Sequence, residues 1–291
     1  MSQSNHHAVW AALLAAALLL LATSVPTARA QYETENEKEF SYVRGAKNGP
    51  ERWGKINKNW TKCGTGEMQS PIDLSDKRVK LVRSLGYLNH SYRPAEASIV
   101  NRGHDIMVKF GGDAGSLVIN GTTYNLHQIH WHSPSEHTVN GRRYDMELHM
   151  VHETVPNKTA VIGILYKVGN PDEFLRKLEP FLKLIADRKD EAEPIGVVDP
   201  RDARGKANAY YRYMGSLTTP PCTEGVIWTL VTEVRSVSKR QLQLSEKPYT
   251  TAWRTMPGRS RSLTTETSAF SSRTRSNTIK IHLCTTATPQ R

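Results

Sequence analysis

The sequence predicts a single β-dominated domain with one or two helices. Three observations support this. Segments rich in β-branched residues, or alternating between apolar and polar side chains, recur along the chain. Only one region has clear helical periodicity, and the sequence contains no internal repeat of about 20–50 residues. The chain has 291 residues, of which 38% are hydrophobic and 23% are charged. It can therefore form a sizeable core, and many strands with few helices argue against a βαβ array.

The predicted strands lie in the middle of the chain. They are the glycine-flanked segments Ile99–Phe110 and Ser116–Tyr124, the alternating segments Asn125–His132 and Tyr144–His152, and the apolar runs Ala160–Tyr166 and Val226–Val234.

One helix is predicted from Pro171 to about Lys189. Asn170 is the expected N-cap, and Pro171 suits the first turn. Pro180 should kink or split the helix. The apolar side chains that share one face are Phe174, Leu178, Leu182 and Ile185.

Residues 1–30 are predicted to be a cleaved signal peptide. Ala8–Ala22 has no charged residue but is shorter than the ~20 residues that a membrane-spanning helix needs. It is followed by Ala28-Arg29-Ala30, a cleavage pattern that would start the mature chain near Gln31. The first residues contain no Lys or Arg, which is atypical of a signal peptide, and an uncleaved anchor is the alternative.

Export would place the three cysteines in an oxidising compartment. A bridge between Cys63 and Cys222 would close a loop of roughly 160 residues, stabilise the fold by about 3–5 kcal/mol and leave Cys284 unpaired. Three buried free thiols are the alternative. The sequons that predict glycosylation are at Asn59, Asn89, Asn120 and Asn157.

The net charge of +11 would by itself suggest nucleic acid or an anionic membrane as a partner. However, residues 249–291 contain seven basic residues and one acidic residue, and Arg29 lies in the predicted signal peptide, so residues 31–248 carry only +4. Residues 31–39 form an acidic leader. In residues 249–291, 17 of 43 residues are Ser or Thr, which predicts a mostly disordered or loosely attached tail.

Three histidines form a candidate metal site. Side chains two residues apart on a strand point to the same face, so His130 and His132 share a face. If the strand that carries His149 is a neighbour, three imidazoles converge. Three imidazoles are a complete protein ligand set for a tetrahedral zinc ion with one open position, which is typical of catalytic sites.

Two further residues could orient these imidazoles. Gln128 and Glu147 each precede a proposed ligand by two residues and can accept the second ring N–H. Ordinary histidines at this spacing are the alternative, and the metalloprotease signature H-E-x-x-H is absent. The spacing alone therefore indicates a zinc site but no reaction.

Eight collinear motifs extend this pattern. They are Phe40-Ser41-Tyr42, 49–53 (GPERW), 69–73 (QSPID), 101–104 (NRGH), 128–132 (QIHWH), 135–138 (SEHT), 147–152 (ELHMVH) and 216–222 (SLTTPPC). With these motifs the chain resembles an α-class carbonic anhydrase of the exported plant type, from about residue 40 to residue 245. The resemblance implies a single domain built on a large, mostly antiparallel, twisted central sheet with a few peripheral helices.

The resemblance also implies the reaction. It identifies the protein as a lyase that reversibly hydrates CO2 to bicarbonate and a proton through attack of zinc-bound hydroxide, with His130, His132 and His149 as zinc ligands. Cys63 and Cys222 match the disulfide of exported members. CO2 and bicarbonate would be the small-molecule partners, and neither nucleic acid nor, after signal cleavage, a membrane is expected.

Other roles are carried over position by position. Thr218 would accept a hydrogen bond from the hydroxide and donate its own proton to Glu136, and Thr219 would line the substrate side. His104 matches the proton shuttle, and Tyr42 matches the tyrosine of the solvent network. The apolar wall beside the substrate would consist of Val151, Val161, Leu217, Val226 and Trp228.

The resemblance fades beyond residue 248. The family normally continues with an Asn-x-Arg-Pro-x-Gln segment and a final strand, and residues 249–291 show no convincing counterpart. The expected catalytic domain therefore covers residues 40–248. A non-catalytic storage or binding relative is one alternative, and a tail-driven binder of anionic polymers is another. The expected location is the secretory pathway, outside the cell or in the apoplast, with a plastid reached by that route as the alternative.

Overall fold

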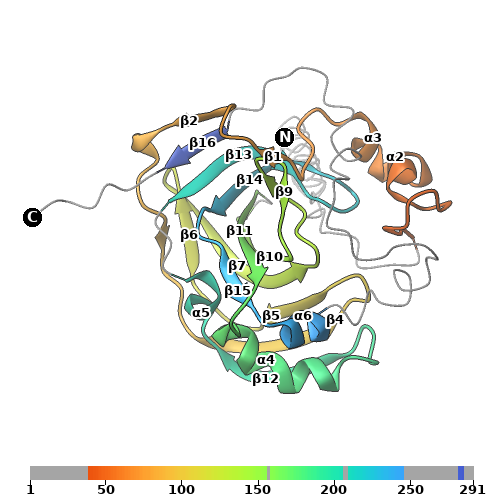
Figure 1. Cartoon of the computed structure of the whole chain (residues 1–291), viewed down its shortest axis with the longest axis vertical. Coiled ribbons are helices and arrows are strands. Elements are labelled where there is room, and N and C mark those ends of the chain that lie inside the picture. Colours follow the sequence, from red (N-terminus) through yellow and green to blue (C-terminus); the bar gives the residue numbers. More distant parts are fainter. Residues whose placement is uncertain (1–38, 156–157, 206–208, 246–280, 285–291) are drawn as a thin grey trace, which may run out of the picture. The chain divides into compact units, whose positions relative to one another are not determined.

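The computed structural model describes residues 39–155, 158–205, 209–245 and 281–284, which form a strand-dominated fold around a large mixed sheet (Figure 1). The β-dominated prediction is confirmed. The spatial order of the main path is β12 (Ala192–Val198), β4 (Ala95–Asn101), β5 (Ile106–Phe110), β7 (Thr122–His132), β10 (Met146–Glu153), β11 (Thr159–Val168), β14 (Glu224–Val231), β13 (Tyr210–Ser216), β16 (Ile281–Cys284) and β2 (Val79–Leu81).

Shorter strands and helices surround this path. β6 (Ser116–Ile119) pairs with β7 and with β3 (Asn89–His90), β15 (Arg235–Val237) pairs with β11, and β1 (Asp73–Leu74), β8 (Thr138–Val139) and β9 (Arg142–Arg143) form a separate small sheet. The helices are η1 (Pro50–Arg52), α2 (Trp53–Ile56), η2 (Lys58–Trp60), α3 (Lys62–Thr65), η3 (Arg83–Leu85), α4 (Glu173–Leu184), α5 (Pro200–Arg204) and α6 (Lys239–Ser245). None of the helices in the described segments has the length and hydropathy needed to cross a membrane.

Most strand pairs are antiparallel, but β11 pairs in parallel with both β14 and β15, β16 pairs in parallel with β2, and in the small sheet β1 pairs in parallel with β8. The predicted segment Ile99–Phe110 contains parts of two strands, because the chain turns between Asn101 and Ile106. The segment Ser116–Tyr124 turns in the same way between β6 and β7. The glycines inside these segments, Gly103 and Gly121, have positive φ angles at the turns, a conformation that glycine adopts at little cost.

Alternation along the central strands divides the core between the two faces of the sheet. On β11, Ile162 belongs to a large apolar cluster with Ile129 and Leu148, whereas Val161 belongs to a second cluster with Trp228. The histidines of β7 alternate with Ile129 and Trp131, so they lie on the face opposite the large cluster.

Helix α4 closes the large cluster. Its predicted apolar face is buried, but the expected N-cap at Asn170 is wrong. Asp172 is the cap, because its buried carboxylate accepts a hydrogen bond from the backbone N–H of Leu175 at 3.0 Å. Nor does Pro180 split the helix, which continues to Leu184. Pro180 and Arg176, whose carbonyl loses its partner, are both exposed, so water can replace the missing N–H.

The predicted disulfide is present between Cys63 and Cys222, with the two Cα atoms 5.0 Å apart. It joins α3 to the segment that follows β13. Next to it, Phe40, Trp53 and Trp60 form a small aromatic cluster. The alternative of free thiols is therefore excluded for this pair.

Strand β16 differs from the expectation for the C-terminal region. The composition predicts that residues 281–284 belong to a mostly disordered or loosely attached tail, yet they pair with β13 on one side and with β2 on the other. Backbone hydrogen bonds to two strands hold this short segment in the sheet, which local composition did not predict. The predicted signal peptide, most of the predicted acidic leader, residues 249–280 and Asn157 lie outside the described residues. The side chains of the other predicted glycosylation sites, Asn59, Asn89 and Asn120, are exposed.

His152 predicts acid sensitivity of the core. Its ring is fully buried on β10, where Nε2 lies 2.8 Å from the Tyr92 hydroxyl and Nδ1 lies 3.2 Å from the Ala160 carbonyl oxygen. Burial lowers the pKa of His152 from 6.5 to about 3. Between these values the unfolded chain binds a proton that the folded chain does not, so stability falls as the pH drops below 6.5.

Because of His152, we expect the unfolding free energy to be about 2 kcal/mol lower at pH 5 than at pH 7, as measured by urea titration at both pH values. The variant His152→Gln should lose less stability over this interval than the wild type. His127→Gln is the control, because His127 is half exposed. An unchanged pH dependence in His152→Gln would contradict the prediction.

Candidate metal centre

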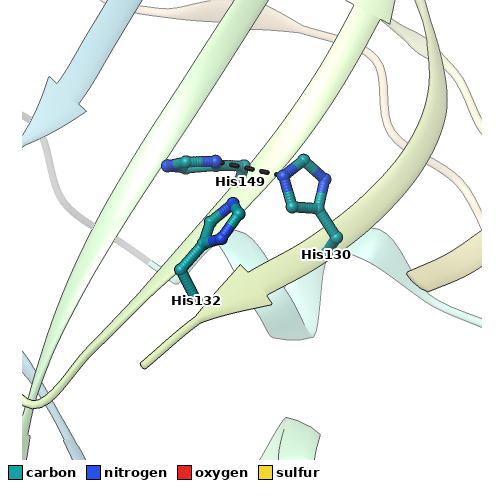
Figure 2. Close-up of side chains that lie close together, drawn as sticks. All are labelled: His130, His132 and His149. Atoms are coloured by element: carbon teal, nitrogen blue, oxygen red, sulfur yellow. Dashed lines mark hydrogen bonds between the residues drawn. The ribbon is translucent and has the colours of Figure 1, made fainter. Parts of the chain in front are cut away.

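The pairing of β7 with β10 brings the three predicted histidines together. His149 lies directly opposite His130 in the antiparallel register, and Glu147 lies opposite His132. His130 and His132 share a face of β7 because they are two residues apart. Figure 2 shows the three imidazoles pointing toward one another from these two strands.

The three side chains are buried, and each offers a ring nitrogen within 4.8 Å of the others. The shortest separation is 3.2 Å, between His130 Nε2 and His149 Nδ1, and it is drawn as a dashed line in Figure 2. Zn–N bonds of about 2.0–2.1 Å in tetrahedral geometry place two ligand nitrogens about 3.4 Å apart. The spacing therefore fits a zinc ion.

The outer ring nitrogens determine which atoms face the centre. His130 Nδ1 lies 2.8 Å from Gln128 Oε1, and His149 Nε2 lies 2.9 Å from Glu147 Oε1. Both oxygens accept, so the protons sit on the outer nitrogens, and His130 Nε2 and His149 Nδ1 direct lone pairs at each other. Two facing lone pairs repel unless a cation lies between them. Burial also lowers the pKa of His130 well below its ordinary value, which keeps it in the neutral form that binds metal.

A buried hydrogen-bond chain supports Glu147. Glu147 Oε1 also lies 2.7 Å from His137 Nδ1, and His137 Nε2 lies 2.6 Å from the Tyr213 hydroxyl, which lies 2.8 Å from the Ser70 hydroxyl. Burial opposes ionisation of Glu147, but His137 and His149 outweigh it and hold the pKa of this carboxyl well below its usual range. The sequence patterns give His137 no role and do not indicate Tyr213 or Ser70 as part of the site.

The predicted polar residues come from two further segments. Thr218 and Thr219 are buried in the segment after β13, which is closed by a hydrogen bond from Cys222 N–H to the Thr219 carbonyl at 2.8 Å. Glu136 Oε2 lies 3.6 Å from His132 Nε2, and the Glu136 backbone N–H donates to Glu147 Oε2 at 2.9 Å. The disulfide at Cys222 holds the threonine segment in place.

The two residues predicted to take part in proton transfer, His104 and Tyr42, lie outside strands β7 and β10. His104 lies on the turn between β4 and β5, with its ring centroid 5.4 Å from that of Phe40. Tyr42 is partly buried and contacts Phe40 and Trp53, each with a ring-centroid distance of 5.7 Å. The aromatic cluster thus extends from the disulfide to His104.

The residues of the predicted apolar wall lie in one cluster, of which Trp228 contacts the centre. All five belong to the second apolar cluster, which they share with Leu74 and Tyr213. Trp228 touches the centre directly, with ring-centroid distances of 4.9 Å to His149 and 4.7 Å to His137. Its Nε1–H donates to the Ser216 carbonyl at 2.9 Å, which fixes the indole ring. The wall residues are Val151, Val161, Leu217, Val226 and Trp228.

Comparisons with known proteins agree with this geometry. The family model for eukaryotic-type carbonic anhydrase matches residues 48–266. Alpha carbonic anhydrase 7 of Arabidopsis thaliana is 51% identical over 212 residues, which cover 73% of this chain and 77% of that protein.

Two solved structures share the fold. The crystal structure of dioscorin complexed with ascorbate aligns with a TM-score of 0.72 and 42% identity, and covers 84% of this chain and 98% of the dioscorin chain. The α-carbonic anhydrase of Thermovibrio ammonificans, in complex with the inhibitor sulfanilamide, aligns with a TM-score of 0.67 and 35% identity over 72% of this chain and 90% of that chain. The protein is therefore a member of the eukaryotic-type carbonic anhydrase family.

Proposed function

We propose that this protein is a zinc-dependent lyase that reversibly hydrates CO2 to bicarbonate and a proton. The observation that carries the proposal is the buried set of three imidazoles, two of which have their outer nitrogens bonded to Gln128 and Glu147. Zinc held by three imidazoles supplies a hydroxide nucleophile at neutral pH, a property for which carbonic anhydrase itself is the established example.

The chain's own residues would orient the reactants. The Thr218 hydroxyl would direct the attacking oxygen toward the carbon of CO2, with Glu136 as the acceptor of the Thr218 proton. Both residues lie in segments that are fixed from outside the centre, Thr218 by the disulfide and Glu136 by the Glu147 carboxylate. Such positioning lowers the entropic part of the barrier. Thr219 would line the same side.

The apolar wall suits the substrate. CO2 is uncharged and has no hydrogen to donate, so it can rest against Val151, Val161 and Trp228 without strong polar contacts. Bicarbonate is charged and gains nothing from this surface, which favours its release.

The released proton must leave the centre. We propose that His104 carries it to buffer and that Tyr42 takes part in the solvent network between them. An imidazole both takes up and releases protons near neutral pH, which suits this role. The expected location is the secretory route, ending outside the cell or in the apoplast, with a plastid as the alternative.

One experiment tests the enzyme proposal. The purified protein should contain one zinc ion per chain by mass spectrometry of the metal, and should hydrate CO2 in a stopped-flow indicator assay far faster than buffer alone. Removing zinc with a chelator should abolish the activity, and adding zinc back should restore it. A folded protein with one zinc per chain and only background hydration would refute the proposal.

The match to dioscorin supports a second candidate, a non-catalytic storage or binding protein. The solved dioscorin structure contains ascorbate, and it covers more of this chain than the Thermovibrio enzyme does. On this alternative the protein would bind ascorbate, measured by calorimetry, while hydration stayed at background. Rapid hydration by the zinc-loaded protein would exclude it.

A further inference from the structure

The turn that carries His104 is held at several points. The Arg102 backbone N–H donates to the Asp105 carbonyl at 2.9 Å and closes the turn. Gly103 has a φ of 87°, and its N–H donates to Asn101 Oδ1 at 2.8 Å. The Asn101 side chain is itself buried. The backbone on both sides of His104 is therefore fixed.

A buried ion pair lies across the same turn. Arg102 Nε donates to Asp105 Oδ1 at 2.6 Å, and Arg102 Nη2 donates to Asp105 Oδ2, so the guanidinium holds both carboxylate oxygens. The two side chains are 5% and 1% exposed. Burial opposes ionisation of Asp105, but the charge and hydrogen bonds of Arg102 outweigh it and hold the pKa of Asp105 well below its usual range. The carboxylate is therefore charged and immobile at neutral pH.

The ring of His104 lies against this carboxylate. His104 is only 3% exposed, and its Nε2 lies 3.7 Å from Asp105 Oδ2, while Phe40 packs on the ring. Within the described part of the chain, neither ring nitrogen of His104 has a hydrogen-bond partner. The contact with Asp105 is thus the polar contact that distinguishes one ring orientation from another.

We infer that Asp105, clamped by Arg102, is a positioning residue that holds His104 for proton transfer; this inference rests on the proposed CO2 hydration. In each turnover one proton passes from the centre to a ring nitrogen of His104 and leaves from the ring to buffer. Asp105 neither gains nor loses a proton, because Arg102 occupies both of its oxygens. Its charge offsets that of the imidazolium and favours the orientation with Nε2 toward the carboxylate.

The first test separates proton transfer from hydration. In this reaction kcat/KM reports the interconversion of CO2 and bicarbonate, whereas kcat in weak buffer reports proton removal. We expect Asp105→Asn to lower kcat about five- to tenfold and to change kcat/KM less than twofold. Imidazole added as a buffer should restore kcat, because it replaces the proton route through His104. An unchanged kcat, or a parallel fall in kcat and kcat/KM, would overturn the inference.

Two further variants distinguish a loss of His104 positioning from a general disturbance of the structure. Asp113→Asn removes an exposed carboxylate from its pair with Arg93 and should leave both constants unchanged. Arg102→Lys keeps both charges but loses the two-point clamp, so it should lower kcat by a smaller factor than Asp105→Asn and again spare kcat/KM. It also provides the test if Asp105→Asn, which leaves a buried guanidinium without its partner, fails to fold.

A second measurement does not depend on enzymatic activity. In the metal-free protein, the ring ¹⁵N resonances of His104, assigned with His104→Gln, should show mainly the tautomer protonated at Nε2. Asp105→Asn should shift the ring toward a mixture of tautomers. If this shift is found in a protein that does not hydrate CO2, the proposed function fails while the positioning of His104 stands. If the tautomer is the same in both proteins, the positioning inference fails whatever the activity.

Discussion

Replacing His130 with asparagine is expected to remove zinc from the protein and to reduce CO2 hydration to near background. The substitution leaves His132 and His149 as the remaining imidazole ligands, and two imidazoles do not complete the protein set of a catalytic zinc site. We expect zinc affinity to fall by more than about 100-fold, since loss of a direct ligand should cost more than the 10–100-fold typical of its supporting partners. Zinc content after dialysis and stopped-flow hydration measure the two effects.

His127→Asn is the matched control, because it makes the same substitution on the same strand. His127 is 52% exposed, pairs loosely with Glu153 at 4.0 Å, and lies where the pairing of β7 with β10 shifts register, away from the three buried imidazoles. It should keep its zinc and its activity. If His130→Asn kept one zinc per chain and wild-type hydration, the metal centre would have to lie elsewhere.

The shared face of His130 and His132 could be predicted from the sequence, because the period of a strand is two and needs no knowledge of its neighbours. The approach of His149 could not be derived in the same way. It depends on the pairing of β7 with β10 in one register, and alternation along a single strand does not determine which strand is adjacent. The resemblance to a known family supplied this contact, and the register then explains it.

The support around Glu147 was only half predicted. Its contact with His149 follows from a spacing of two on one strand, but His137 comes from the segment before β8, and Tyr213 comes from β13, distant in the sequence. No local pattern links these positions. The placement of β16 could not be predicted for the same reason, since neither of its partners, β13 and β2, is its neighbour in the sequence.

Glu147→Gln is expected to have the second largest effect, on both stability and zinc affinity. Glu147 is fully buried and accepts four hydrogen bonds, at Oε2 from the backbone N–H groups of Glu136 and His137 and at Oε1 from the rings of His137 and His149. A glutamine has the same shape but places an NH2 group where one oxygen was. In the place of Oε2, the NH2 group would face two backbone N–H groups, which cannot become acceptors. In the place of Oε1, it would face two imidazole N–H groups, and these rings can accept a hydrogen bond there only by changing tautomer.

Either outcome is unfavourable, so the unfolding free energy of the metal-free protein should fall by about 3 kcal/mol in a urea titration. If the NH2 group faces the rings, His149 must accept at Nε2 and carry its proton on Nδ1, the atom that faces the centre, so zinc affinity should fall about 10–100-fold in a competition assay with a chelator. Glu153→Gln, on the same strand and partly exposed, is the control and should change neither quantity. Equal stability and equal zinc affinity in Glu147→Gln and the wild type would show that this carboxylate neither orients His149 nor anchors the loop of Glu136.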